Sequence, residues 1–532
     1  MNDNSTVRAS ITSAATGGSA SSLSRRTLLQ GTAAAMALWS WPQPAHAAGK
    51  PVSVAIGADL TSLDPHKFVS GLDHAFFSNV FESLMVHDQD GTLIPALAES
   101  VTVSEDGLVH TFALRKGVTW HNGDPFSAED VRFSWTRSID PAIGNSRASV
   151  VSNKIKDIEI VDPYTVRMIL KAPDASLHQN FPTYFYMVPK NYIEKVGDEA
   201  FGANPIGTGP FRYTDRKASE FVKFAPYEAH YRIVPKVGEV TLKIIPDDQT
   251  RMAQAQTGES DIVTSVPLIF AARMSGAGGF RILRAPSFSN AFMVFNNRGN
   301  NEDLQKVEVR RAINLAIDRE SLMKALTFGF ATPHKFTCTP GMIGCDAVAE
   351  NPYRYDPQEA RRLLTEAGFN FDRPLKIVGP ATGRVTQARE TVEAVAQSLA
   401  SAGIRTEIEI LEFGTWATVA FAKPKDPSID MYLLSAGDAS PDPGPRMIRT
   451  LRTGEAMSFF SNDELDDALA ALGRMRTAQE YEQQMRSVYL VIHKLAANVP
   501  LWSYDAIYAV RDGVTFEPFK NINWPVMWYA AK

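Results

Sequence analysis

The stretch Phe112–Trp135, FALRKGVTWHNGDPFSAEDVRFSW, decides the fold of this chain. Polar and apolar side chains alternate over residues 109–114, which predicts a β-strand, and the Gly-Asp-Pro cluster at 123–125 predicts a turn. Ser127 stands where a helix N-cap belongs. Acidic residues follow at 129–130, where negative charge complements the exposed amides of a first helical turn. We therefore expect a strand, a turn and the start of a helix.

The motif in this stretch, LR-x-GV-x-W-H-x-G-x-PF-x-AEDV, resembles the hallmark of the family 5 extracytoplasmic solute-binding proteins. These are the peptide and nickel receptors of ABC importers. Further stretches resemble the same family from Leu63 to Trp502, so the resemblance covers nearly all of the chain. They are SLDPH at 62–66, NVFESLM at 79–85, NPIGTGPF at 204–211, GESDI at 258–262, VRRAINLAIDR at 309–319 and YDP at 355–357.

The resemblance implies an α/β fold of the bilobal, class II periplasmic-binding-protein type with an extra inserted α+β domain. Alternating strand and helix patterns after residue 286 independently favour a doubly wound α/β lobe. We expect a discontinuous domain I, an inserted domain II and a domain III. Their predicted ranges are 48–80 with 190–285 and 498–532, then 81–189, then 286–497.

Residues 1–47 have the pattern of an export signal. Arg25 and Arg26 precede an apolar run at 31–41, and Ala45-His46-Ala47 forms an A-x-A cleavage pattern. A membrane anchor is the alternative, but this run is far shorter than the roughly 20 residues that a bilayer requires. We expect a cleaved twin-arginine signal, with Ala48 as the first mature residue and the periplasm as the destination.

Charge and cysteine content narrow the class of protein. The chain has 54 basic and 59 acidic residues, without the basic excess typical of nucleic-acid binding. Its two cysteines, Cys338 and Cys345, lie close together in a loop rich in Thr, Pro and Gly. In an oxidising compartment this spacing favours a local disulfide, and His334 alone is a poor further ligand for a metal site. We expect the mature chain to be a soluble monomer.

Catalytic motifs are missing from the sequence. It contains no G-x-S-x-G, H-E-x-x-H, C-x-x-C or dinucleotide fingerprint, and its ten histidines are scattered. The two glycines of 204–211 could suggest a phosphate loop, but no Gly-Lys-Ser/Thr follows, so we expect a sharp turn between domains. We predict neither an enzyme nor a cofactor.

Candidate ligand contacts come from the resemblance. Val69, Ser70 and Gly71 follow SLDPH where relatives line the cleft, although a plain loop would look the same. Arg384 lies near the arginine with which peptide receptors hold the ligand carboxylate, and a guanidinium can do this in bidentate fashion. Trp416 matches a tryptophan of the cleft wall. A solvated loop arginine and a core tryptophan are the respective alternatives.

The segment 433–443, LLSAGDASPDP, departs from the family pattern. Peptide receptors read close to LLGWGADYPDP, and their first aspartate holds the peptide amine. In an ungapped alignment Ala439 replaces that aspartate, while Asp438 comes one residue early and could face away from the cleft. Either the loop shifts register and Asp438 still serves, or the amine anchor is absent. The departure favours absence. Asp442 is expected to be a turn residue.

These observations predict an exported receptor that captures a peptide, a peptide-like molecule or another small organic solute and delivers it to a membrane permease. A periplasmic enzyme exported folded with its cofactor is the rival interpretation, suggested by the twin-arginine signal alone. A chaperone-like binder of extended chains is a third.

Overall fold

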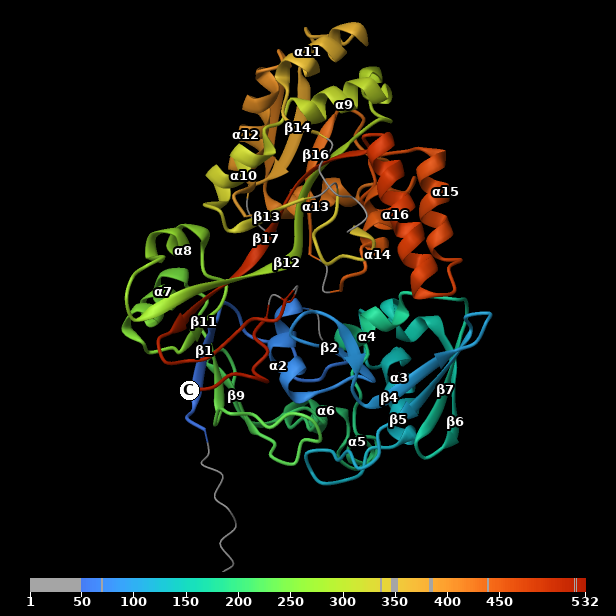
Figure 1. Ribbon diagram of the computed structural model, residues 1–532, viewed down its shortest axis with the longest axis vertical. Helices are drawn as coiled ribbons and strands as arrows, with labels where there is room; N and C mark the ends of the chain where they lie inside the picture. The colour runs from blue at the N-terminus through green and yellow to red at the C-terminus, as the bar shows by residue number, and fades with distance from the viewer. Residues whose placement is uncertain are drawn as a thin grey trace, which may run out of the picture. The chain divides into compact units, whose positions relative to one another are not determined.

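A mixed sheet of eleven strands runs through the computed structural model, which describes residues 49–67, 70–334, 337–345, 353–381, 386–437, 440–520, 522 and 524–532 (Figure 1). Its strand order is β15-β14-β16-β12-β17-β11-β1-β10-β9-β8, and β13 pairs with β17. The strands are β1 (Val52–Ile56), β8 (Phe211–Lys217), β9 (Phe221–Pro226), β10 (Val240–Ile244), β11 (Ile262–Val263), β12 (Phe280–Phe295), β13 (Ala331–Pro333), β14 (Leu375–Pro380), β15 (Thr406–Leu411), β16 (Met431–Gly437) and β17 (Asn498–Arg511).

The long strands β12 and β17 join two parts of the sheet. They pair antiparallel from Phe280 opposite Arg511 to Val294 opposite Asn498. One end of the pair meets β11, while the other meets β16, and Figure 1 shows the two strands running together between these regions. The register shifts between Ala285 and Ser289. Such an irregularity bends a strand locally and increases its twist.

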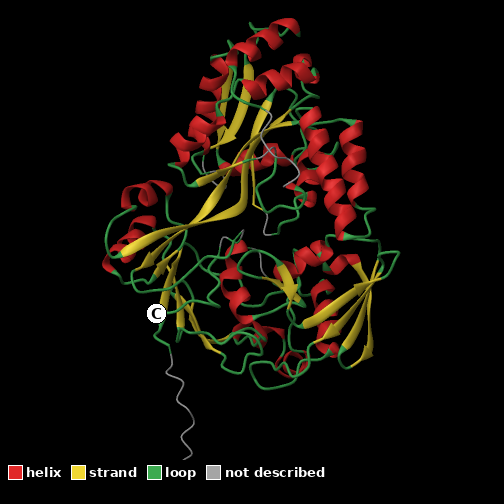
Figure 2. Cartoon of the chain, in the orientation of Figure 1, coloured by secondary structure: helices red, strands yellow, loops and turns green. Residues whose placement is uncertain are grey.

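The last part of the chain forms an α/β layer on β14, β15 and β16. Strand β14 runs parallel to both neighbours, and Figure 2 shows helices flanking these strands. This arrangement confirms the predicted fold class. The helices are α9 (Val307–Leu315), α10 (Arg319–Thr327), α11 (Pro357–Glu366), α12 (Ala388–Ala400), α13 (Phe413–Phe421), α14 (Gly444–Leu451), α15 (Asp463–Leu472) and α16 (Ala478–Lys494).

The opening stretch belongs to a separate four-stranded antiparallel sheet, β4-β5-β7-β6. Alternate residues of β5 are buried, as the pattern predicts, and Ser127 and Asp130 form a capping box at the start of α3. Trp120 is 1% exposed in the hydrophobic core beneath this sheet. The elements are β2 (Met85–His87), β3 (Leu93–Pro95), β4 (Ala98–Val103), β5 (Val109–Leu114), α3 (Ala128–Ile139), β6 (Ile155–Asp162), β7 (Thr165–Leu170) and α4 (Phe181–Tyr184).

The remaining helices pack around β1, β10 and β11. A hydrophobic core that includes Val54, Phe76 and Leu242 lies against α2, α5 and α6, and a second core that includes Ala55 and Met252 lies against α7 and α8. These helices are α2 (His74–Val80), α5 (Lys190–Val196), α6 (Asp198–Ala203), α7 (Asp248–Thr257) and α8 (Leu268–Met274).

Hydrogen bonds of His121 join the opening stretch to the motif at 204–211. Its Nδ1 accepts a hydrogen bond from the Gly207 N–H at 3.1 Å, and its Nε2 donates to the Gly209 carbonyl at 2.9 Å. Burial lowers the pKa of His121 to about 4, so the ring is neutral and can accept at one nitrogen while donating at the other. The Gly209 N–H in turn donates to the Val80 carbonyl at 3.0 Å.

A buried ion pair joins the SLDPH motif to α3. Arg137 of α3 donates to both carboxylate oxygens of Asp64, at 3.0 and 2.6 Å, and also to Asp198 at 2.8 Å. His66 Nδ1 lies 3.1 Å from Arg137 Nη1, and its Nε2 lies 3.0 Å from the Tyr186 carbonyl. Burial would raise the pKa of Asp64, but the Arg137 guanidinium outweighs it and holds that pKa below its ordinary value. The SLDPH motif is therefore anchored to α3.

Candidate functional site

Ser70 and Gly71, two of the predicted contacts, lie just before α2. Ser70 Oγ accepts the Leu72 N–H at 3.1 Å, and the Ser70 N–H donates to Asp73 Oδ2 at 3.1 Å, which forms a capping box. Asp73 also accepts the Thr61 N–H at 2.7 Å. Gly71 is exposed, and nothing lies within 4 Å of where its Cβ would be. This turn is fixed by its own hydrogen bonds and leaves open space beside Gly71.

Three other predicted positions, Val69, Arg384 and Asp438, lie outside the described residues. So do Ala47 and Ala48 of the predicted cleavage site. The predicted disulfide is confirmed, with Cys338 and Cys345 bonded at an S–S distance of 2.02 Å.

Trp416 is 4% exposed in α13. Its indole N–H donates to the Leu433 carbonyl at 3.2 Å, and its ring stacks on Phe413 and on Tyr432, with centroids 5.4 and 5.8 Å away. These contacts hold α13 against β16, the strand that leads into the atypical segment. A role for Trp416 in the cleft wall stays a prediction.

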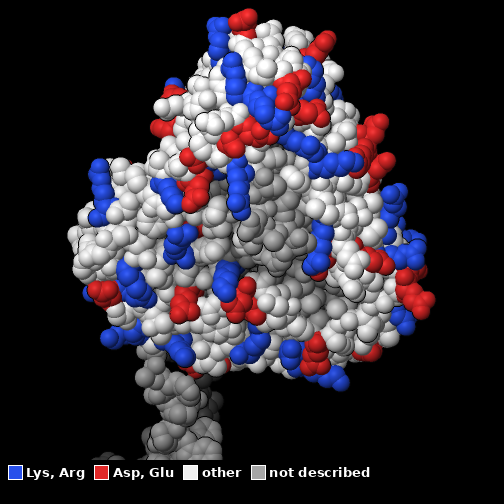
Figure 3. Space-filling model, turned by 45° about the horizontal axis from the view of Figure 1, so that its top comes forward, with Lys and Arg blue, Asp and Glu red and all other residues white. Residues whose placement is uncertain are grey.

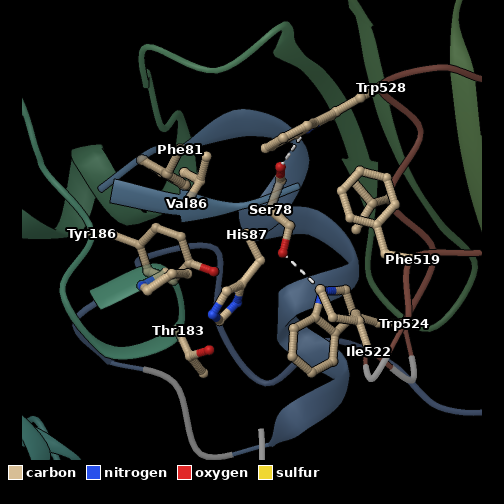
Figure 4. Close-up of a pocket in the computed structure, with 12 residues that line it drawn as sticks. Ser78, Phe81, Val86, His87, Thr183, Tyr186, Phe519, Ile522, Trp524 and Trp528 are labelled. Atoms are coloured by element: carbon tan, nitrogen blue, oxygen red, sulfur yellow. Dashed lines mark hydrogen bonds between the residues drawn. The ribbon is translucent and has the colours of Figure 1, made fainter. Parts of the chain in front are cut away.

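An aromatic pocket opens beside the C-terminal half of α2 (Figure 4). Ser78 fixes two of the aromatic side chains that line this pocket. Its Oγ accepts the Trp524 indole N–H, and its carbonyl accepts the Trp528 indole N–H, both at 2.8 Å. His87 Nε2 has no hydrogen-bond partner among the described residues, and burial lowers the pKa of His87 to about 4. The cavity measures about 30 Å³. That volume holds a water molecule or two, not a peptide-sized solute.

A larger cavity of about 430 Å³ lies between residues 153–176 and residues 442–481. Asp442 is 4% exposed on its wall. Its Oδ1 accepts hydrogen bonds from the Tyr481 hydroxyl at 2.7 Å and from the Gly444 N–H at 3.0 Å. The second bond confirms the predicted turn role. Asp442 Oδ2 has no partner among the described residues, and burial, aided by the negative charge of Asp174, raises the pKa of Asp442.

The sequence patterns missed this cavity. Its walls are contributed by segments more than 250 residues apart, so no local spacing could place Ser176 near Tyr481. Ser440 also reaches across, because its Oγ lies 3.5 Å from the Gln179 carbonyl. A signal was available for Asp442 alone, since it lies within the segment 433–443, whose sequence departs from the family pattern.

The described residues form neither a metal-binding cluster nor a membrane-spanning helix. They contain no group of three or more His, Cys, Asp or Glu side chains placed to hold a metal ion. Within the same residues, every helix is too short or too polar to cross a bilayer. On the face shown in Figure 3, basic and acidic side chains are interspersed.

Comparison with known proteins adds to this geometry. Residues 92–458 match the bacterial extracellular solute-binding proteins, family 5 Middle. The glutathione-binding protein GsiB of Salmonella choleraesuis is 30% identical over 465 residues, which cover 85% of this chain and 89% of that protein. GsiB of Shigella flexneri is 29% identical over 472 residues, again covering 85% and 89%.

Solved structures share the fold at lower identity. HbpA2 from Haemophilus parasuis superposes with a TM-score of 0.80 at 20% identity, covering 91% of this chain and 99% of that one. DppA from Helicobacter pylori, in complex with the peptide STSA, has a TM-score of 0.70 at 24% identity, with coverages of 91% and 98%. The chain belongs to the family 5 bacterial extracellular solute-binding proteins, the solute receptors of ABC importers.

Proposed function

We propose that this receptor takes up a peptide or a peptide-like organic solute between two lobes that move about β12 and β17. The observation that carries the proposal is this strand pair, which connects the α/β layer on β14–β16 with the strands around β1. An irregularity at 285–289 interrupts its regular pairing. Closure is driven by ligand when contacts to both lobes form only in the closed state.

Separate hydrophobic cores support the predicted domains II and III. One core draws its buried members from Leu84 to Met187, within the proposed domain II at 81–189. Another draws them from Phe288 to Tyr504, close to the proposed domain III at 286–497. The remaining ranges, 48–80, 190–285 and 498–532, would form domain I. The register shift of β12 falls at the proposed boundary.

The chemistry of relatives supports the solute class. The two curated relatives are named for glutathione, and DppA of Helicobacter pylori is described in complex with a peptide. In our proposal Ser70 and Gly71 line one wall, with Val69 beside them, and Arg384 pairs with the solute carboxylate. Trp416 acts by positioning β16, since its own N–H is already bonded to Leu433.

The amine of the solute is the point at which we propose a difference from peptide receptors. Ala439 stands where those receptors carry the amine-binding aspartate, so we propose that Asp438 does not hold an ammonium. Burying an unpaired charge would then disfavour free peptide amines by roughly 2 to 5 kcal/mol. Isothermal titration calorimetry with matched free and N-acetylated peptides tests this. A preference for the free amine that disappears in Asp438→Ala would overturn it.

Small-angle scattering and native mass spectrometry test the receptor function itself. The expected results are one trapped small solute per monomer and a lower radius of gyration when the solute is returned to stripped protein. Arg384→Gln should weaken the binding of a carboxylate solute, whereas Arg389→Gln, on the exposed face of α12, should not. The proposal would be contradicted if neither method detected saturable binding of a solute.

Export and delivery complete the proposed function. Residues 1–47 would direct the folded chain to the periplasm through the twin-arginine route, with cleavage between Ala47 and Ala48, and a membrane permease would receive the solute. Replacing Arg25 and Arg26 by Lys should block export, and N-terminal sequencing of exported protein should begin at Ala48. A stoichiometric flavin, haem or metal in the purified protein would instead favour the folded, cofactor-carrying enzyme.

A further inference from the structure

A cavity of about 270 Å³ is lined by basic side chains at the N-terminal end of β16. It lies where the loop 422–425 meets residues 454–458 and the end of β12. Arg298, Lys423 and Lys425 line it together with a single acidic residue, Glu455. Strand β16 spans about 20 Å from Met431, near this cavity, to Gly437, the residue before Asp438. The cavity is therefore distinct from the proposed solute site.

Within the described part of the chain, no carboxylate pairs with the cations of this cavity. Glu455 is already paired with Arg452. Arg298 donates to the Ser458 carbonyl at 3.1 Å, and Lys425 donates to the carbonyls of Ala420 and Ala456 at 2.5 and 2.7 Å. Among the described residues, no carboxylate lies within ion-pair distance of Arg298, Lys423 or Lys425.

The carbonyl contacts hold both Arg298 and Lys425 in place. The Lys425 ammonium lies 4.7 Å from the centre of the Phe459 ring, in addition to its two carbonyl contacts. Burial, together with the like charges of Lys423 and Arg298, lowers the pKa of Lys425 to about 8. Fixed donors of like charge around a cavity repel one another, and a bound anion would relieve that repulsion.

We propose that this cavity binds a small tetrahedral oxyanion of the phosphate or sulfate class. Such an anion offers acceptor oxygens in several directions, which matches cations that converge from the loop 422–425 and from the chain just beyond β12. The Arg298 guanidinium and the Lys423 ammonium supply the exposed contacts, while Lys425 supplies a half-buried one. A free anion and the phosphate of a lipid headgroup present the same chemistry.

Isothermal titration calorimetry of the full mature chain with inorganic phosphate and with sulfate, at constant ionic strength and near neutral pH, tests the site. We expect saturable binding of one anion per chain. Arg298→Gln and Lys423→Gln should each weaken it at least ten-fold. Lys195→Gln, which removes an exposed charge on α5, should leave it unchanged. Both cavity variants alter exposed side chains, so thermal unfolding should verify that they fold.

A second arm identifies the source of the phosphate. Sedimentation with vesicles containing an anionic phospholipid, compared with neutral vesicles, measures headgroup binding. Free-anion binding that is lost in Lys423→Gln supports a site for soluble oxyanions, and vesicle binding that is lost in the same variant supports a lipid headgroup. The proposal is overturned if neither probe binds, or if binding is the same in Arg298→Gln, Lys423→Gln and Lys195→Gln.

Discussion

The imidazole of His121 accepts the Gly207 N–H at 3.1 Å and thereby joins two motifs that lie 86 residues apart. In His121→Ala, the Gly207 N–H and the Gly209 carbonyl lose their side-chain partner. We expect a loss of about 2 to 4 kcal/mol in the free energy of unfolding, measured by urea denaturation. Asn122→Ala, at the exposed next position, should cost less than about 1 kcal/mol. Equal effects of the two substitutions would show that the hydrogen bonds of His121 contribute no particular stability.

Gly207 is required because the chain passes close to Val80. A Cβ on Gly207 would lie 1.9 Å from the Val80 carbonyl oxygen, so Gly207→Ala should destabilise the protein by about 3 kcal/mol or more. Gly202 is the matched control, because its Cβ would meet only Asp64 Cβ at 3.9 Å. Gly202→Ala lies within α6 and should stabilise it by about 0.5 to 1 kcal/mol. Thermal unfolding of both variants measures the contrast.

The buried pair of Arg137 and Asp64 should respond strongly to the loss of one partner. Arg137→Ala leaves the Asp64 carboxylate buried and uncompensated, at an expected cost of about 3 to 5 kcal/mol. Arg132→Ala, on the exposed face of the same helix, removes a surface pair with Glu129 and should cost less than about 1 kcal/mol. Chemical denaturation of the two variants tests this. Similar values would show that the Asp64 pair contributes no more than a surface bridge.

How much of this fold could be predicted depends on the range of the interactions. The strand at β5 and the Ser127 cap are encoded by neighbouring residues, so the pattern at 109–130 predicted both. The contact of His121 with Gly207 has no local signal. Its partners meet only after the sheet of β5 has packed against the chain near Val80.

In the candidate site, too, only the features with a local sequence signal could be predicted. Ser70 and Gly71 could be located because a short motif precedes them, and the structure gives that turn its own hydrogen bonds. For Trp416 the sequence could not separate a core side chain from a cleft wall, since both are apolar positions of a helix. The cavity beside Asp442 could not be predicted, because its opposite wall comes from residues 153–176.

Acid should destabilise the receptor before its carboxylates titrate. Burial lowers the pKa of six histidines to about 3 or 4 in the folded protein. In the unfolded chain the same side chains have a pKa near 6.5. Their stabilising effect is complete above that pH and is lost as the pH falls toward about 4, because the unfolded state then binds more protons. The slope should approach about 1.4 kcal/mol per pH unit for each histidine. The six are His66, His74, His87, His121, His178 and His334.

Urea denaturation at a series of pH values from about 8 to about 5 measures that slope. Added salt should change it little, because burial rather than surface charge is its main cause. A free energy of unfolding that stays constant across this range would contradict the assignment of these rings as neutral in the folded protein.

The contribution of Asp442 to stability should change with pH in the opposite direction from that of the histidines. Burial raises its pKa, so the folded state binds the proton more tightly, and its contribution to stability declines as the pH rises through that raised pKa. Asp442→Asn keeps an oxygen for the Tyr481 hydroxyl and the Gly444 N–H but removes the charge. It should match or exceed the wild type in unfolding free energy near pH 8, by up to about 3 kcal/mol, and lose that advantage in acid. Tyr481→Phe removes the 2.7 Å hydrogen bond and should destabilise the protein by about 1 to 3 kcal/mol. Destabilisation by Asp442→Asn near pH 8 would mean that the carboxylate is charged and paired in solution.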